Sequence, residues 1–215
     1  EEGRPEGPWR ASGRRAAVSG GGGGGDVAAL LRAGGDAGSG ALPGTLDALF
    51  ERIVELAPQR DCLGARPVLR ADRQWSTSRG VMLEKLTLGG YEFLSRSEVL
   101  ERVDALARGL AQGLGVGRGQ RVAIYGNTHL DWACAAHAIW RAGGTVVTVY
   151  ASLGLEALAE ALAETEVGVV FAEAALLPAL AEISATLPAI KAVVAMSGDP
   201  EPGINFPGAS LHHMN

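Results

Sequence analysis

Three side chains that could bind a metal or act as nucleophiles occur close together in the sequence: His129, Cys134 and His137. Cys134 and His137 are three residues apart, so on a helix they would share a face and could fill two positions of a metal site. The surrounding segment is rich in Ala, however, and a thiol in such a helix usually packs as a small apolar group. Cys62 is the only other cysteine, which excludes the repeated close spacing of a structural zinc site. We therefore expect neither a metal site nor a catalytic residue here.

A glycine-rich stretch at 113–119 could in principle cradle a phosphate. Its glycines do not have the Gly-x-Gly-x-x-Gly spacing, and they precede a predicted strand instead of following one. A nucleotide P-loop also requires a lysine directly after its last glycine, and neither Lys85 nor Lys191 follows a glycine. The sequence contains no Gly-x-Ser-x-Gly element, so the nucleophile of a common α/β hydrolase is missing as well.

Three polar residues remain as candidates for binding. Asn127 follows an apolar run at 121–125, whereas Tyr150 and Ser152 lie at the end of the next run, 145–150. Ligands of open parallel sheets gather outside the carboxyl ends of the strands. We therefore take Asn127, Tyr150 and Ser152 as candidate substrate-binding residues at the rim of a pocket. Turn formation and helix capping are the alternative roles for all three.

The elements that would position these residues repeat about every 23 residues. Apolar, β-branched runs occur at 121–125, 145–150, 168–171 and 191–196, and helical patterns separate them at 128–142, 155–164 and 173–186. Such an alternation is typical of right-handed βαβ crossovers. The predicted fold class is therefore α/β, with a parallel sheet covered by helices.

A small hairpin is predicted before this sheet. Two short runs, 83–88 and 91–94, are joined by Gly89 and Gly90, a two-residue connection that favours a hairpin turn. Residues 60–80 show no regular pattern.

Two helices flank the hairpin in the sequence. The first follows Thr45, a good N-cap residue, and stops before Pro58. The second begins at a capping box formed by Ser95 and Glu98 and ends near Gly113.

Residues 1–44 differ from the rest of the chain because they contain 14 glycines and few large apolar residues. Such a segment buries too little surface to offset its chain entropy, which predicts a disordered, Gly-rich leader. Residues 45–215 form the predicted folded domain. Glu1 occupies the position of an initiating methionine, so we expect a piece of a longer protein.

Composition excludes several classes of function. The 215 residues are 47% hydrophobic and carry a net charge of −5, which gives no overall basic field for nucleic acid. Two cysteines are too few for a disulfide framework and favour a reducing compartment. The uncharged run 142–155 is shorter than the roughly 20 residues that a membrane-spanning helix needs.

The run VAIYGNTHLDW at 122–132, together with residues 145–171, closely resembles the N-terminal region of long-chain acyl-CoA synthetases, which belong to the adenylate-forming, AMP-binding superfamily. Residues 91–110 and 186–196 are similar to the neighbouring parts of that region, so the resemblance covers about 45–196. The Tyr-Ala-Ser-Leu-Gly turn at 150–154 resembles the fatty acid branch of the superfamily.

The resemblance implies that a fatty acid reacts with ATP to give an acyl-adenylate, which coenzyme A then converts to acyl-CoA, with Mg²⁺ neutralising the phosphates. The phosphate loop, the adenine and ribose contacts and the catalytic lysine of this family have no counterpart within residues 1–215. We therefore expect the domain to be truncated before the phosphate loop. Fatty acid, ATP and CoA would bind through missing regions, and the chain alone would be inactive.

The resemblance also implies an intracellular protein without a transmembrane segment, able to associate peripherally with a membrane such as the endoplasmic reticulum or an organelle surface. Two other functions stay open. One is a non-catalytic interaction module on the same α/β scaffold. The other is a different adenylating enzyme, such as an activator of amino acids or aryl acids.

Overall fold

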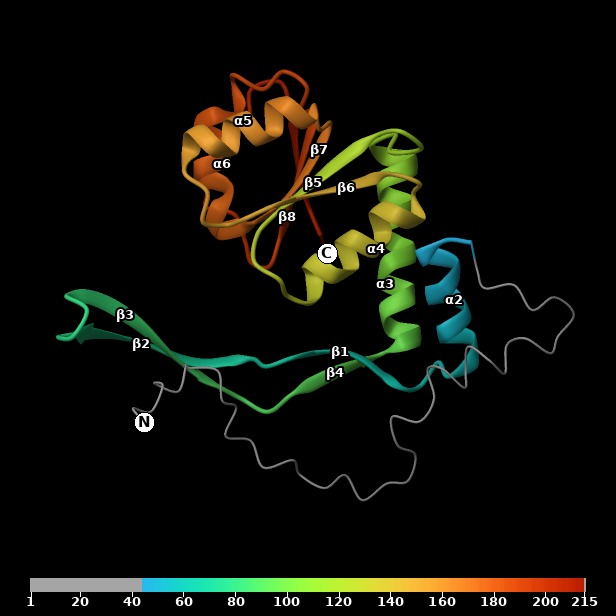
Figure 1. Ribbon diagram of the computed structural model, residues 1–215, viewed down its shortest axis with the longest axis horizontal. Helices are drawn as coiled ribbons and strands as arrows, with labels where there is room; N and C mark the ends of the chain where they lie inside the picture. The colour runs from blue at the N-terminus through green and yellow to red at the C-terminus, as the bar shows by residue number, and fades with distance from the viewer. Residues whose placement is uncertain (1–43, 215) are drawn as a thin grey trace, which may run out of the picture. The chain divides into compact units, whose positions relative to one another are not determined.

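The computed structural model describes residues 44–214. The predicted disordered leader falls outside the described residues except for Gly44, and it stays a prediction. The elements follow one another in the order α2 (Leu46–Leu56), β1 (Asp61–Ala65), β2 (Val68–Ser76), β3 (Val81–Leu88), β4 (Glu92–Ser95), α3 (Arg96–Arg108), η1 (Gly109–Gly113), β5 (Arg121–Tyr125), α4 (Leu130–Arg141), β6 (Thr145–Val149), α5 (Leu155–Thr165), β7 (Val169–Glu173), η2 (Ala174–Leu176), α6 (Leu177–Ser184), β8 (Ala192–Met196) and β9 (Ser210–His213) (Figure 1).

A five-stranded sheet of order β6-β5-β7-β8-β9 carries the fold. Every neighbouring pair in it is parallel, and Arg121 of β5 lies opposite Thr145 of β6. All five residues of β8 are buried, as is typical of a parallel strand with helices on both sides. The predicted α/β fold with a covered parallel sheet is thus confirmed. The short strand β9 was not predicted.

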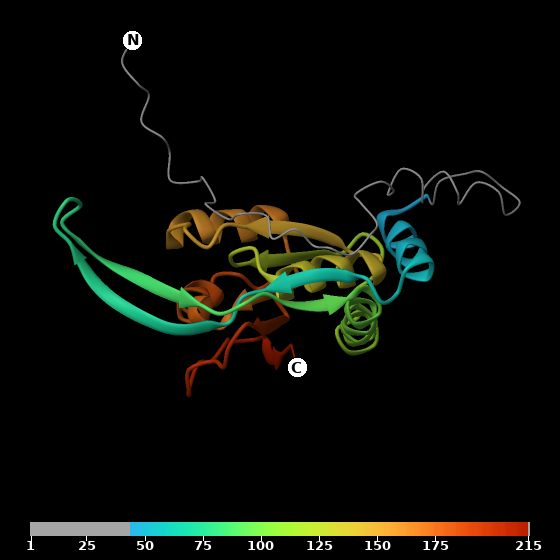
Figure 2. The ribbon, with the colours of Figure 1, turned by 90° about the horizontal axis from the view of Figure 1, so that it is seen from below.

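Helices cover both faces of this sheet (Figure 2). Ile124 and Phe171 join one buried cluster with residues of α2, α3 and α4. Val170 and Val193 join a second cluster with residues of α5 and α6. Adjacent residues of a strand point to opposite faces, so the two cores share the strands but not the side chains.

The first two helices begin where the sequence predicts. The Thr45 hydroxyl accepts a hydrogen bond from the Ala48 amide at 3.1 Å and caps α2. Ser95 and Glu98 form the predicted capping box of α3, and those hydrogen bonds lower the pKa of the Glu98 carboxyl. The helix then continues into a π-helical turn, η1, which ends at Gly113.

One cation links the helices of the first face. The Arg141 guanidinium of α4 binds Asp47 of α2 at 3.0 Å, Glu51 of α2 at 2.5 Å and Asp104 of α3. Burial lowers the pKa of Arg141, but these three carboxylates outweigh it and raise the value above its ordinary range. The helices α2, α3 and α4, which pack in this core, are therefore also linked by ion pairs at its edge.

The predicted hairpin is wrong. Strand β3 pairs with β2, and β4 pairs with β1, both antiparallel, so Gly89 and Gly90 do not form a turn. The turn lies between Ser76 and Gly80, where the Gly80 amide donates to the Ser76 carbonyl at 2.8 Å and Gly80 has φ +65°. A Cβ on Gly89 would lie 3.0 Å from Pro67, so this glycine permits close approach of the opposite chain.

Residues 60–80 are correspondingly not irregular, because they contain β1 and β2. Nearly every residue of β2 is exposed, and charged residues interrupt its apolar ones. A strand that buries so little has no strong hydrophobic alternation, which explains why the pattern was missed. We call β2, β3 and their turn, residues 68–88, the ribbon.

Candidate functional site

The carboxyl edge of the sheet contains a topological switch point. From β5 the chain passes through α4 to β6 on one side, whereas from β7 it passes through α6 to β8 on the other side. Since α4 and α6 lie on opposite faces, the loops after β5 and β7 diverge at this edge. Ligands of open α/β sheets bind at such switch points.

A carboxylate from β7 occupies this position. Glu173, the last residue of β7, accepts a short hydrogen bond from the Asn127 main-chain amide, and its other oxygen lies 3.5 Å from Asn127 Nδ2. A Cβ on Gly126 would come within 2.9 Å of Glu173 Oε1 and 3.0 Å of Met196 Cε. The glycine is therefore required by the close packing of the Glu173 carboxyl against the loop after β5.

Three further side chains extend this contact into a network. Ser197, which directly follows β8, donates to Asp131 Oδ2 at 2.8 Å and lies 3.1 and 3.2 Å from the two ring nitrogens of His129. His129 Nε2 is 3.6 Å from Glu173 Oε1. His129 also caps α4 by accepting from the Trp132 amide at 3.4 Å. We call Asn127, His129, Asp131, Glu173 and Ser197 the edge network.

The backbone of Ser197 is unusual for a residue with a side chain. Its φ is +54°, in the left-handed region, and Gly198 follows with φ +117°. A non-glycine residue in this region is strained, and such strain is found at sites where the surrounding structure holds a residue in place. Here the hydrogen bond to Asp131 fixes the Ser197 hydroxyl over the N-terminus of α4.

The edge network does not form a Ser-His-Asp catalytic triad. The Ser197 hydroxyl donates to Asp131, and it is nearly equidistant from both imidazole nitrogens, so neither nitrogen is directed to remove its proton. What the network can do is bind: it offers two carboxylates, an imidazole and an amide at the edge where three strands end.

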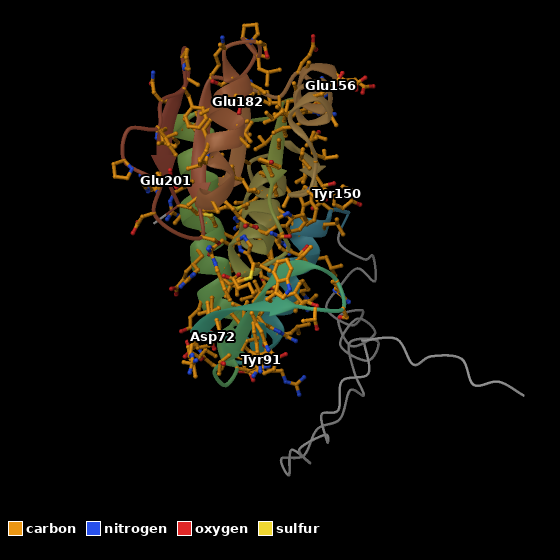
Figure 3. The ribbon with its side chains drawn as sticks, turned by 90° about the vertical axis from the view of Figure 1, so that its left-hand side faces the viewer. Asp72, Tyr91, Tyr150, Glu156, Glu182 and Glu201 are labelled. Carbon is orange, nitrogen blue, oxygen red and sulfur yellow. The ribbon has the colours of Figure 1, made fainter. Side chains whose placement is uncertain are left out.

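The three residues predicted from the sequence separate in the structure. Asn127 belongs to the edge network. Tyr150 is 78% exposed and points away from the molecule (Figure 3), and Ser152 is also exposed. The Leu153 amide donates to the Tyr150 carbonyl at 3.2 Å, so both residues belong to the turn after β6. Sequence reasoning missed both Glu173, which it placed at the start of the predicted helix 173–186, and Ser197, which directly follows the predicted strand 191–196.

Cys134 and His137 are structural. Burial raises the pKa of the Cys134 thiol to about 11, which keeps it protonated and poorly suited to bind a metal. His137 packs between the rings of Phe50, at 4.6 Å, and Trp140, at 5.2 Å. Within residues 44–214 no group of three or more His, Cys, Asp or Glu side chains could hold a metal ion.

The described residues also do not fit a magnesium triphosphate. The loop amide after β5, which could have bound a phosphate, is bound to the Glu173 carboxylate. Of the two lysines, Lys191 donates to the Pro188 carbonyl at 2.6 Å and Lys85 lies in the exposed ribbon. None of the helices in this part of the chain has the length and hydropathy needed to cross a bilayer.

Comparison with known proteins identifies the family to which this part of the chain belongs. A family model described as AMP-binding enzyme matches residues 73–210, which include most of the ribbon, the strands β5 to β8 and the edge network. The chain belongs to the AMP-binding enzyme family. The resemblance stated from the sequence is thereby confirmed.

Two relatives within the AMP-binding enzyme family carry fatty acid names. Long chain acyl-CoA synthetase 8 of Arabidopsis thaliana is 35% identical over 171 residues, which are 79% of this chain and 23% of the relative. The long-chain-fatty-acid–CoA ligase FadD15 of Mycobacterium tuberculosis is 31% identical over 119 residues, 55% of this chain and 20% of the relative. The chain thus spans less than a quarter of the length of these relatives.

A solved structure shows the same fold. The A-PCP didomain of carboxylic acid reductase from Segniliparus rugosus, in complex with AMP, superposes with a TM-score of 0.64 at 19% identity. The superposition covers 86% of this chain and 27% of that one. At this identity it establishes that the described residues share the architecture of one part of an adenylation domain.

Proposed function

We propose that this chain is the N-terminal part of a long-chain fatty acid:CoA ligase, and that residues 45–215 belong to its AMP-binding domain. The observation that carries the proposal is the 35% identity to long chain acyl-CoA synthetase 8, which extends over 79% of the chain. It includes the turn after β6, where the fatty acid branch of the superfamily has a similar Tyr-Ala-Ser/Thr-Leu-Gly sequence.

The proposed reaction has two steps. A carboxylate oxygen of the fatty acid attacks the α-phosphorus of ATP and releases pyrophosphate, which leaves an acyl-adenylate. The thiol of coenzyme A then attacks the acyl carbonyl carbon, and the bond to AMP breaks. Mg²⁺ would balance the charge of the triphosphate in the first step.

The described residues would contribute scaffold to this reaction. Their sheet is buried on both faces, and the carboxylate at its switch point repels phosphate instead of binding it. ATP, Mg²⁺, coenzyme A and the fatty acid would therefore bind through regions outside residues 1–215. On this proposal Asn127 stands at the rim of the substrate site, held there by Glu173, while Tyr150 and Ser152 shape the neighbouring turn.

Exchange of radiolabelled pyrophosphate into ATP tests the proposal. We expect no exchange by the 215-residue chain with any acid. The protein encoded by a complete transcript, extended beyond Asn215, should catalyse exchange with palmitate and then form palmitoyl-CoA when CoA is added. Benzoate and single amino acids, at the same concentration, serve as control acids.

Each other result selects a different function. Exchange by the 215-residue chain itself would refute the idea that its catalytic groups lie elsewhere. Exchange by the longer protein with benzoate or an amino acid, but not with palmitate, would indicate a different adenylating enzyme. No exchange by the longer protein would favour a non-catalytic module.

A further inference from the structure

One face of the ribbon combines apolar ends with a charged centre. Every second residue of β2 points to the same side as its partner directly opposite in β3. Three cross-strand pairs form one face in this way: Trp75 with Met82, Arg73 with Glu84, and Ala71 with Leu86. We call these six residues the Trp75 face. Its middle pair carries opposite charges, and its outer pairs are apolar.

The Trp75 face is exposed although it is mostly apolar. Trp75 is 56% exposed, Met82 54% and Leu86 47%. Among the described residues β2 and β3 pair only with each other, and neither strand contains a buried residue (Figure 1). A two-stranded ribbon is at best marginally stable in water unless something packs against it. A partner on this face would therefore also stabilise the ribbon.

The opposite face of the ribbon is more polar. Its cross-strand pairs are Arg70 with Thr87, Asp72 with Lys85, Gln74 with Leu83, and Ser76 with Val81. The ion pair between Arg70 and Asp72 belongs to this face. Because both faces are carried by the same two strands, substitutions on this face are controls for substitutions on the Trp75 face.

The Trp75 face is complementary to itself. A two-fold rotation about the strand direction lays a second ribbon on it, with β3 of one copy over β2 of the other. Arg73 of each copy then faces Glu84 of the other copy, and the outer apolar pairs face each other in the same way. The strands of the two copies stay aligned, as in the common packing of two sheets. Such a contact is isologous, because both copies use the same surface.

Charge selects this arrangement over the alternative one. A two-fold rotation about the direction across the strands would place Arg73 on Arg73 and Glu84 on Glu84, which is repulsive. In the first arrangement both central pairs have opposite charges, so the contact leaves no charge unpaired. The six residues carry no net charge, so the two faces do not repel each other on approach.

We propose that the Trp75 face is a homodimer interface, on which a second copy of this chain packs with Arg73 against Glu84. The apolar pairs supply the affinity, and the central charges fix the register. One face of a ribbon is small beside the ~800 Å² per partner of a standard interface, so the dimer should be weak. We expect half of the chain to be dimeric at roughly 100 μM. This inference goes beyond the proposed reaction and does not depend on it.

Sedimentation equilibrium of the full 215-residue chain, with a reducing agent present, tests the proposal. The dimer fraction should rise with protein concentration. Leu86→Ser should raise the dissociation constant of the dimer about tenfold or more, because a symmetric interface contains each substitution twice. Leu83→Ser is the matched control, because it removes an exposed leucine of the same strand from the opposite face. It should leave the dimer unchanged.

Charge variants test the register of the contact. Arg73→Glu places four carboxylates at the centre of the dimer, and Glu84→Arg places four guanidinium groups there. Each variant alone should raise the dissociation constant about a hundredfold or more. An equal mixture of the two should associate again, because one chain then presents only carboxylates and the other only guanidinium groups. Lys85→Glu is the control, since it creates a similar cross-strand repulsion, with Asp72, on the opposite face.

Four results would overturn the proposal. A chain that is monomeric at all concentrations has no such interface, and its Trp75 face would be left to a different partner. A dimer that Leu83→Ser weakens as much as Leu86→Ser does would depend on the ribbon as a whole. A dimer that either charge variant retains, or a mixture of the two variants that stays monomeric, would show that Arg73 and Glu84 do not meet across the contact.

Discussion

The five-stranded sheet and the ribbon are both hydrogen-bonded β-structure, but their side chains have opposite environments. Every residue of β8 is buried, whereas no residue of β2 or β3 is. The backbone ladder is therefore common to both regions and cannot account for a difference in stability. What distinguishes them is apolar burial, which is the dominant favourable term in folding.

Truncation of a large side chain should show this difference most strongly. Phe171 of β7 is 1% exposed and packs in the core with α3 and α4, so we expect Phe171→Ala to lower the free energy of unfolding by about 3–5 kcal/mol. Trp75→Ala in the ribbon removes an even larger ring but should cost less than about 1 kcal/mol, because that ring is mainly in water. Urea denaturation followed by circular dichroism measures both. Equal costs would mean that the ribbon is covered in solution.

Ion pairs provide the second comparison. Arg141→Met leaves three carboxylates of α2 and α3 without their common cation, and we expect it to cost about 2 kcal/mol. Arg70→Met removes one end of the Arg70–Asp72 pair of the ribbon, whose arginine is 72% exposed, and should change stability by less than about 0.5 kcal/mol. Urea midpoints in low and high salt would distinguish the two. A salt-independent, negligible effect at Arg141 would contradict the structural role assigned to it.

Glycines test how closely each region is packed. Gly126→Ala introduces a Cβ within 3.0 Å of Glu173 and Met196 at the edge of the parallel sheet, and we expect a cost of about 1–2 kcal/mol. Gly90→Ala, next to the ribbon, introduces a Cβ with nothing within 4 Å and should be nearly neutral. Thermal unfolding measures both. A neutral Gly126→Ala would show that the Glu173 carboxyl is free to move away from its loop.

The same contrast explains what could be predicted from the sequence. The strands 121–125 and 192–196 were recognised because burial on both faces demands continuous apolar runs. The ribbon was predicted wrongly for two reasons. No core requires alternating apolar and polar residues in β2. The pair Gly89–Gly90 resembled a hairpin turn, whereas in the structure Gly89 only allows the close approach of Pro67.

The edge network was only partly predictable. Asn127 could be identified from its place directly after β5, one of the two strands that flank the switch point. The contacts of Glu173 with Asn127, 46 positions apart in the chain, and the positive φ of Ser197 depend on how the strands align in three dimensions. No local pattern encodes either one.

The smallest expected effect concerns His137, which is half-buried against Phe50 of α2 and whose buried Nδ1 has no hydrogen-bond partner within residues 44–214. Burial lowers the pKa of this imidazole, and the nearby Asp47 only partly opposes the shift. Between the folded and unfolded pKa values the unfolded chain binds more protons, so stability must rise with pH there. The stabilisation is complete above the unfolded value, roughly 6.5, and is lost as the pH falls through the lower folded value.

We therefore expect the urea midpoint to decrease between pH 8 and pH 5, and to decrease less in His137→Phe. Phenylalanine keeps the ring contacts with Phe50 and Trp140 and removes the unpaired nitrogen, so the variant should be at least as stable as the original chain at pH 8. His213→Gln, which changes an exposed histidine of β9, is the matched control variant. If the urea midpoint of His137→Phe kept the full pH dependence of the original chain, the protons would be taken up by groups other than His137. The contact of His137 with α2 would then not be the source of the pH dependence.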